Sequence, residues 1–136
     1  MGMVQVGAQA PEELAERFAQ FVAAADIDGI VGLYAADAIV SVAEGREVVG
    51  AAGIRAAFDA ALAAGDGFGV EGTVEGRAVL AGTLAMTSFT GTDGVVRTQV
   101  ARREADGTWL WVRDGSTLRH LVADDAADSV DIHDVA

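Results

Sequence analysis

Apolar residues follow a helical spacing in the first half of the chain and a strand-like pattern in the second half. We expect a first amphipathic helix over residues 11–25, because its apolar residues share one face and Pro11 suits the first helical position. Asp26 is a suitable cap for a second, short helix whose apolar face ends at Tyr34. Almost no linker separates the two helices, so the pattern predicts a packed helix pair.

The segment Ala38–Val42 is short and rich in β-branched residues, which predicts a strand. A third helix is expected over Gly50–Ala64, with Gly65 as its C-terminal stop. From Phe68 onward, extended segments and turns ending in Asp-Gly predict an antiparallel meander. Its last three strands are expected over residues 83–90, 95–104 and 108–118. Helices followed by a meander predict an α+β fold, with the helices packed on one face of the sheet.

Length and composition narrow the class of protein. The chain has 136 residues, which suits one domain over residues 11–119, with an N-terminal extension over 1–10 and an acidic tail over 120–136. It has no cysteine, so disulfides and thiolate chemistry are excluded. The net charge of −12 disfavours nucleic acid and anionic membrane surfaces as partners. No apolar run reaches the roughly 20 residues that span a bilayer, and no signal peptide is evident, so we expect a cytoplasmic protein.

Three segments, in this order and spacing, resemble a known family: DIDGIVGLYAADAIV, GREVVGAAGIRAAF and READGTWLWVRDGS. The chain is similar to the nuclear transport factor 2-like superfamily over residues 12–119, and within it to SnoaL-like and ketosteroid isomerase-like proteins. The resemblance implies a cystatin-like cone, an α+β barrel in which three helices pack in a strongly curved, mainly antiparallel sheet. It also implies an apolar pocket inside the cone, and commonly a homodimer formed through the outer sheet face.

Three positions that carry steroid isomerisation in that family hold other residues here. Phe18 stands where the isomerases have an oxyanion-binding tyrosine, and Val42 stands where they have the general base. Gln99 stands where they have a protonated aspartate. Because Val42 cannot accept a proton, the resemblance does not extend to the isomerase mechanism.

A set of polar residues is nevertheless predicted to face the pocket, by the resemblance for Tyr34 and Asp59 and by strand alternation for the others. These polar candidates are Tyr34, Asp59, Ser88, Arg97, Gln99, Asp114 and Ser116. The expected apolar walls are Phe18, Phe21, Val40, Val42, Phe58, Leu62 and Met86. Asp114 is the first choice for catalysis, because a carboxyl facing an apolar cone has a raised pKa. The alternative is a structural ion pair of Asp114 with Arg97 or Arg113.

On the last strand, Trp109, Trp111 and Arg113 alternate to the opposite, convex face. Exposed tryptophans beside an arginine are typical of an interface, so these residues are predicted to form a homodimer contact. The alternative is that the acidic tail covers them.

Neither histidine, His120 nor His133, has partners at metal-ligand spacing, and no phosphate-binding or serine-hydrolase motif is present, so no metal or cofactor is expected. The first hypothesis is a SnoaL-like protein that binds a small apolar or aromatic molecule. If it is an enzyme, acid–base chemistry through Asp114, with Tyr34, Gln99 and Ser116 orienting the ligand, would make it a cofactor-independent isomerase, cyclase or lyase. The second hypothesis is a non-catalytic dimerisation or ligand-binding module.

Overall fold

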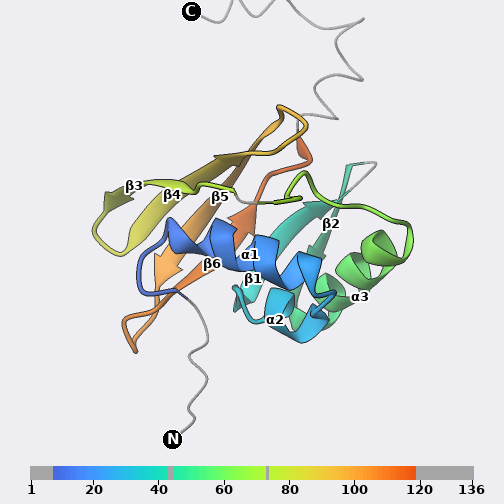
Figure 1. Ribbon diagram of the computed structural model, residues 1–136. Coiled ribbons are helices and arrows are strands. Elements are labelled where there is room, and N and C mark those ends of the chain that lie inside the picture. Colours follow the sequence, from blue (N-terminus) through green and yellow to red (C-terminus); the bar gives the residue numbers. More distant parts are fainter. Residues whose placement is uncertain (1–7, 43–44, 73, 119–136) are drawn as a thin grey trace, which may run out of the picture.

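The protein, seen in a computed structural model that describes residues 8–42, 45–72 and 74–118, is an α+β fold with its helices on one face of a sheet (Figure 1). The helices are α1 (Glu13–Ala23), α2 (Ile27–Val31) and α3 (Gly50–Ala63). The strands are β1 (Tyr34–Val42), β2 (Arg46–Val49), β3 (Arg77–Ala81), β4 (Leu84–Thr90), β5 (Val96–Arg103) and β6 (Trp109–Asp114).

The described strands form one mixed sheet in the order β2-β1-β6-β5-β4-β3. All neighbouring pairs are antiparallel except β1 and β6, which are parallel. The sheet is curved but not closed within these residues, since β2 and β3 remain as its two edges. The predicted α+β class is confirmed, with an open sheet in place of a closed barrel.

The helices form for the reasons that the apolar spacing indicated. Helix α1 buries Leu14, Ala15, Phe18 and Ala19 against the sheet. At the start of α2, the Asp26 carboxylate accepts a hydrogen bond of 2.9 Å from the backbone N–H of Gly29, as expected of an N-cap. The predicted ends of the first and third helices lie within two residues of the observed ones.

Tyr34 is placed differently from the prediction, because it begins β1 and does not lie on a helix. Helix α2 ends at Val31, and β1 starts four residues before the predicted Ala38. The reason is a long-range pairing, Tyr34 with Trp111 of β6, which local sequence does not reveal.

The two tryptophans of β6 are buried, so the prediction that they are exposed is wrong. Trp109 and Trp111 are 5% and 1% exposed, and only Arg113 lies at the surface. In the β5–β6 register, Val100 pairs with Arg113 and Ala101 with Trp111, so Val112 is an extra residue in a β-bulge. The bulge breaks simple alternation, and Trp111 and Asp114 therefore both face the helices.

Strand β4 also faces the helices with the side opposite to the one predicted. Its buried residues are Ala85, Thr87 and Phe89, whereas Met86, predicted to line the pocket, is 65% exposed. The strand carries apolar residues on both faces, so its sequence alone does not specify the inward side.

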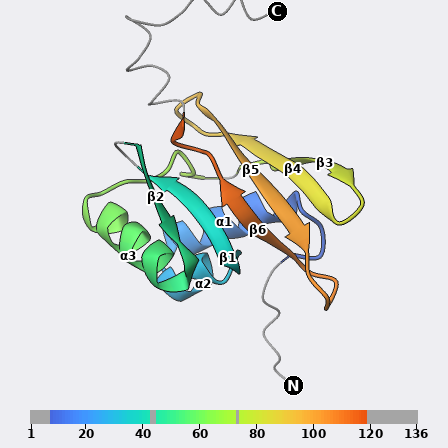
Figure 2. The same ribbon diagram turned by 180° about the vertical axis from the view of Figure 1, so that it is seen from behind.

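The outer face of the sheet carries no helix in the described part of the chain (Figure 2). Exposed apolar side chains gather there on the strands near the β3 edge: Val79, Leu84, Met86 and Val96. None of the helices in the described ranges is long and apolar enough to cross a membrane.

Candidate functional site

A cavity of about 580 Å³ lies between α3, the middle of α1 and the inner face of the sheet. Nine residues predicted to face the pocket line it: Phe18, Tyr34, Val40, Val42, Phe58, Arg97, Gln99, Asp114 and Ser116. A cavity of this size with mostly apolar walls and a few polar groups is the common form of a small-molecule site.

Five residues predicted to face the pocket do not line this cavity: Phe21, Asp59, Leu62, Met86 and Ser88. Asp59 is exposed on α3, and Met86 is exposed on the outer face of β4. Ser88 is partly buried but is on the same strand face as Met86. The β4 residue that hydrogen-bonds to the Gln99 side chain is Thr87, on the opposite face of the strand from Ser88.

The structure adds residues that sequence analysis did not place in the site. They include Ser41, Phe68, Phe89, Trp111 and Thr117. Trp111 was assigned to the wrong face by alternation, and the bulge at Val112 explains this. Phe68 belongs to an irregular glycine-rich loop, whose side-chain directions follow no period.

Four aromatic rings form a cluster on one wall of the cavity, and each ring packs against two of the others. The ring centroids are 5.8 Å apart for Phe18 and Phe58, and 5.9 Å apart for Phe58 and Tyr34. Trp111 completes the cluster, 5.3 Å from Tyr34 and 5.9 Å from Phe18. Such tilted and edge-on pairs are favourable beyond simple burial, so the rings stabilise one another as an aromatic wall.

Asp114 ends β6 beside this wall and accepts hydrogen bonds on both carboxylate oxygens. The Tyr34 hydroxyl donates to Oδ2 over 2.6 Å. The Ser116 backbone N–H and hydroxyl both donate to Oδ1. Ser41 donates to the Asp114 backbone carbonyl over 3.0 Å, and the Thr117 hydroxyl donates to Ser41. The carboxylate is therefore held in one orientation at the cavity wall.

Burial and hydrogen bonding act in opposite directions on this carboxyl. Burial is the largest influence and raises the pKa of Asp114, while the hydrogen bonds from Ser116 and Tyr34 and the charge of Arg97 lower it in part. Burial also raises the pKa of Tyr34 well above its usual value, and the neighbouring Asp114 charge adds to this. A carboxyl with a raised pKa is suited to exchange protons near neutral pH.

The alternative of a structural ion pair is not found among the described residues. Arg113 is exposed and donates to backbone carbonyls, one of them on Asp37. Arg97 pairs instead with Asp93, at 2.8 Å. Its guanidinium also lies 6.0 Å from the centre of the Phe89 ring. The Asp114 carboxylate therefore accepts hydrogen bonds from the Tyr34 and Ser116 hydroxyls and the Ser116 backbone N–H, and the described arginines form no ion pair with it.

A second group of buried polar residues adjoins Asp114. The Trp111 indole N–H donates to Thr87 Oγ1 over 3.0 Å, and Thr87 donates to Gln99 Oε1 over 2.7 Å. Gln99 Nε2 then donates to Ser116 Oγ over 3.3 Å. Gln99 and Asp114 are also direct cross-strand partners, so their side chains lie side by side on the inner face.

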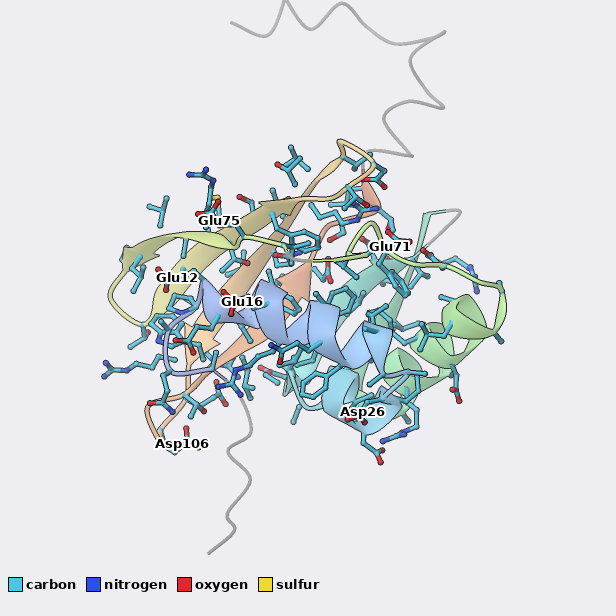
Figure 3. The ribbon with its side chains drawn as sticks, viewed as in Figure 1. Glu12, Glu16, Asp26, Glu71, Glu75 and Asp106 are labelled. Atoms are coloured by element: carbon cyan, nitrogen blue, oxygen red, sulfur yellow. The ribbon has the colours of Figure 1, made fainter. Side chains whose placement is uncertain are left out.

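Acidic residues are numerous, but they do not converge on a metal site in the described ranges. Figure 3 shows Glu12 just before α1, Glu16 on α1, Glu71 and Glu75 on the segment before β3, and Asp106 in a distant turn. No group of three or more histidine, cysteine, aspartate or glutamate residues in that part of the chain is placed to hold an ion. His120 and His133, with the acidic tail, lie outside the described residues.

No family model matches the sequence, and no curated protein matches it. Solved structures do match the fold. One is an NTF2-like protein of unknown function from Pseudomonas putida KT2440, 21% identical over 75% of this chain and 79% of that protein, with a TM-score of 0.51. Another, from Nostoc punctiforme PCC 73102, is a protein of unknown function with a cystatin-like fold, 18% identical over 75% of this chain and 83% of that protein, with a TM-score of 0.55.

A third match is a ketosteroid isomerase-like protein from Erwinia carotovora atroseptica SCRI1043. It is 16% identical over 77% of this chain and 95% of that protein, with a TM-score of 0.51. These matches confirm, for the fold, the resemblance that the three sequence segments indicated. The chain has the nuclear transport factor 2-like, cystatin-like fold.

Proposed function

We propose that this chain is a SnoaL-like protein that binds a small aromatic or otherwise apolar molecule in the cavity and acts on it through Asp114. The observation that carries the proposal is the position of Asp114, a buried carboxylate with two neighbouring hydroxyl donors at the wall of a largely apolar cavity. A positioned carboxylate of raised pKa is a suitable general base. Proton abstraction by Asp114 would support an isomerase, cyclase or lyase reaction without a cofactor.

The aromatic wall supports binding of a flat ligand, and the hydrogen-bonded carboxylate supports orientation of its polar group. Tyr34 and Ser116 stabilise the charged form of Asp114 by hydrogen bonds, so the carboxylate can form inside an apolar site. The isomerase mechanism is not part of the proposal, because Phe18 and Val42 carry no group that donates or accepts a proton.

The proposal is tested by native mass spectrometry of the purified protein, followed by extraction and identification of any bound compound. Ala57 lines the cavity, so Ala57→Trp fills it, whereas Ala63→Trp adds the same ring at an exposed position of the same helix. We expect a discrete compound on the wild type and on Ala63→Trp, and none on Ala57→Trp. Equal retention by all three proteins would contradict binding in this cavity.

A second proposal concerns assembly, and it moves the interface away from the tryptophans. We propose a homodimer formed through the outer face of β3 and β4. Val79 and Met86 are cross-strand partners, 75% and 65% exposed, and form the centre of an apolar patch. This dimer is compatible with the catalytic proposal. If the cavity binds no ligand, the dimer alone is the second hypothesis, a non-catalytic dimerisation module.

A further inference from the structure

The hydrogen bonds around Asp114 form a series in which each donor and acceptor can be assigned, starting from the Trp111 indole N–H. An indole N–H only donates, so Thr87 Oγ1 must accept from it. The single hydroxyl proton of Thr87 is then available for Gln99, whose side-chain Oε1 lies 2.7 Å away and is a closer acceptor than the backbone oxygen of the same residue at 3.5 Å. The orientation of the Gln99 amide therefore follows from Trp111 and Thr87, and Nε2 is on the side of Ser116.

The series continues to the carboxylate. Gln99 Nε2 donates to Ser116 Oγ, and the Ser116 hydroxyl donates to Asp114 Oδ1. From the other side, the Tyr34 hydroxyl gives its proton to Oδ2. Each of these hydrogen bonds is directed towards Asp114, so the ionised carboxylate is the end point of the network.

This direction decides what the site offers to a ligand. Each carboxylate oxygen has more than one lone pair, and Tyr34 Oη keeps lone pairs because its proton is committed to Asp114. Beside these acceptors, Gln99 Nε2 carries a second hydrogen, for which the described residues show no acceptor. The site thus presents an anionic acceptor and a neutral donor side by side.

We infer that the ligand class of this site is a hydroxyl-bearing aromatic molecule, a phenol or an aromatic enol, whose O–H donates to Asp114 and whose oxygen accepts from Gln99. The inference deepens the proposed function and rests on it. A ketone or an ether accepts from Gln99 but gives nothing to Asp114, and leaves the carboxylate without a partner from the ligand. An ammonium group donates to Asp114 but has no acceptor for the Gln99 N–H, so two donors would face each other.

The inference gives Thr87 and Trp111 the role of positioning residues, which act on the ligand through Gln99. Thr87 is 4% exposed and is not itself among the cavity-lining residues. Its hydroxyl has two partners, so its effect on the ligand comes through the orientation of the amide and not through contact.

The test compares three probes of one shape: naphthol, methoxynaphthalene and acetonaphthone, substituted at the same ring position. Calorimetric titration is done at about pH 8, well above the ordinary pKa of a carboxyl, which favours the ionised form. We expect naphthol to bind about tenfold or more tightly than the other two, since a hydrogen bond to a charged group contributes more than one to a neutral group. Acetonaphthone binding as tightly as naphthol would overturn the inference and leave the proposed function standing. A failure of all three probes to bind would overturn both.

Two variants test the role of Thr87. Thr87→Val keeps the shape of the side chain but removes the hydroxyl, so the Gln99 amide loses its fixed orientation and the preference for naphthol should fall to within about threefold. Thr87→Ser keeps the hydroxyl and should retain the wild-type preference. An unchanged preference in Thr87→Val would overturn the positioning role. Loss of preference in both variants, with naphthol still bound, would also overturn it.

Discussion

The Tyr34 hydroxyl donates a 2.6 Å hydrogen bond to Asp114 Oδ2 and so joins the first residue of β1 to the last residue of β6. The two residues are on parallel neighbouring strands, with Tyr34 opposite Trp111 in the register. Both side chains are buried, so each changes the protonation of the other.

The ionisation of Tyr34 can be followed alone, because it is the only tyrosine in the chain. Burial and the Asp114 charge raise its pKa well above 10.0. In an absorbance titration of the phenolate, we expect no ionisation near pH 10 while the protein is folded. Asp114→Asn removes the neighbouring charge and should lower the midpoint, although burial remains. A wild-type midpoint near the ordinary value would contradict the buried hydrogen bond.

The raised pKa of Asp114 makes stability depend on pH in a defined direction. The folded chain keeps the Asp114 proton to higher pH than the unfolded chain, whose carboxyl titrates at about 3.9. At pH values between the unfolded-state and folded-state pKa of Asp114, the folded chain binds more protons than the unfolded chain. This residue therefore makes the free energy of unfolding fall as pH rises. Relative to Asp114→Asn, the wild type should be most stable in acid and lose that advantage as pH rises through the raised pKa of the folded state.

Urea unfolding of both proteins across this pH range measures the difference. Tyr34, which donates a hydrogen bond to Asp114, stays neutral throughout it, because its pKa is raised well above its usual value. Asp37 and Asp93, whose pKa values are lowered by hydrogen bonds from arginine, titrate in both proteins and cancel in the comparison. A wild-type advantage that grows with rising pH would contradict the dominance of burial.

Gly76 lies in the segment before β3, next to the backbone of Glu12, which precedes α1. A Cβ at this position would collide with the backbone carbonyl oxygen of Glu12. Gly76→Ala is therefore expected to lower the free energy of unfolding by about 2–3 kcal/mol, as in overpacked cores.

The matched control is Gly82→Ala, at a turn glycine of φ 63° with no atom within 4 Å of the added Cβ. It should cost only the strain of the left-handed conformation, about 1 kcal/mol. Chemical denaturation compares the two. Equal costs would show that the segment before β3 moves away from α1 without penalty.

The proposed dimer is expected to break when charge is placed on the outer sheet face. Val79→Lys and Met86→Lys put a cation at the centre of the apolar patch, where desolvating it opposes association. Sedimentation equilibrium should show a dimer for the wild type and a monomer for either variant. Ala63→Lys, exposed on α3, is the control and should remain a dimer. A monomeric wild type would refute the outer-face interface.

Local sequence determined the helices and the class of the fold. The α1 and α3 apolar faces, the Asp26 cap and the Asp-Gly turns each act within a few residues, so pattern alone indicates them. The inward position of Asp114 was also predicted, although by an alternation that the bulge at Val112 interrupts.

Tertiary structure decided the faces of the strands and the partners of the site. Trp111 and Thr87 turn inward because of a bulge and a cross-strand register, and both depend on residues far away in the chain. Tyr34 becomes part of a strand because β6 pairs with it in parallel. A two-sided apolar strand has no local preference for either face, so only its packed neighbours select the inward side chains and place Thr87 and Trp111 beside Gln99.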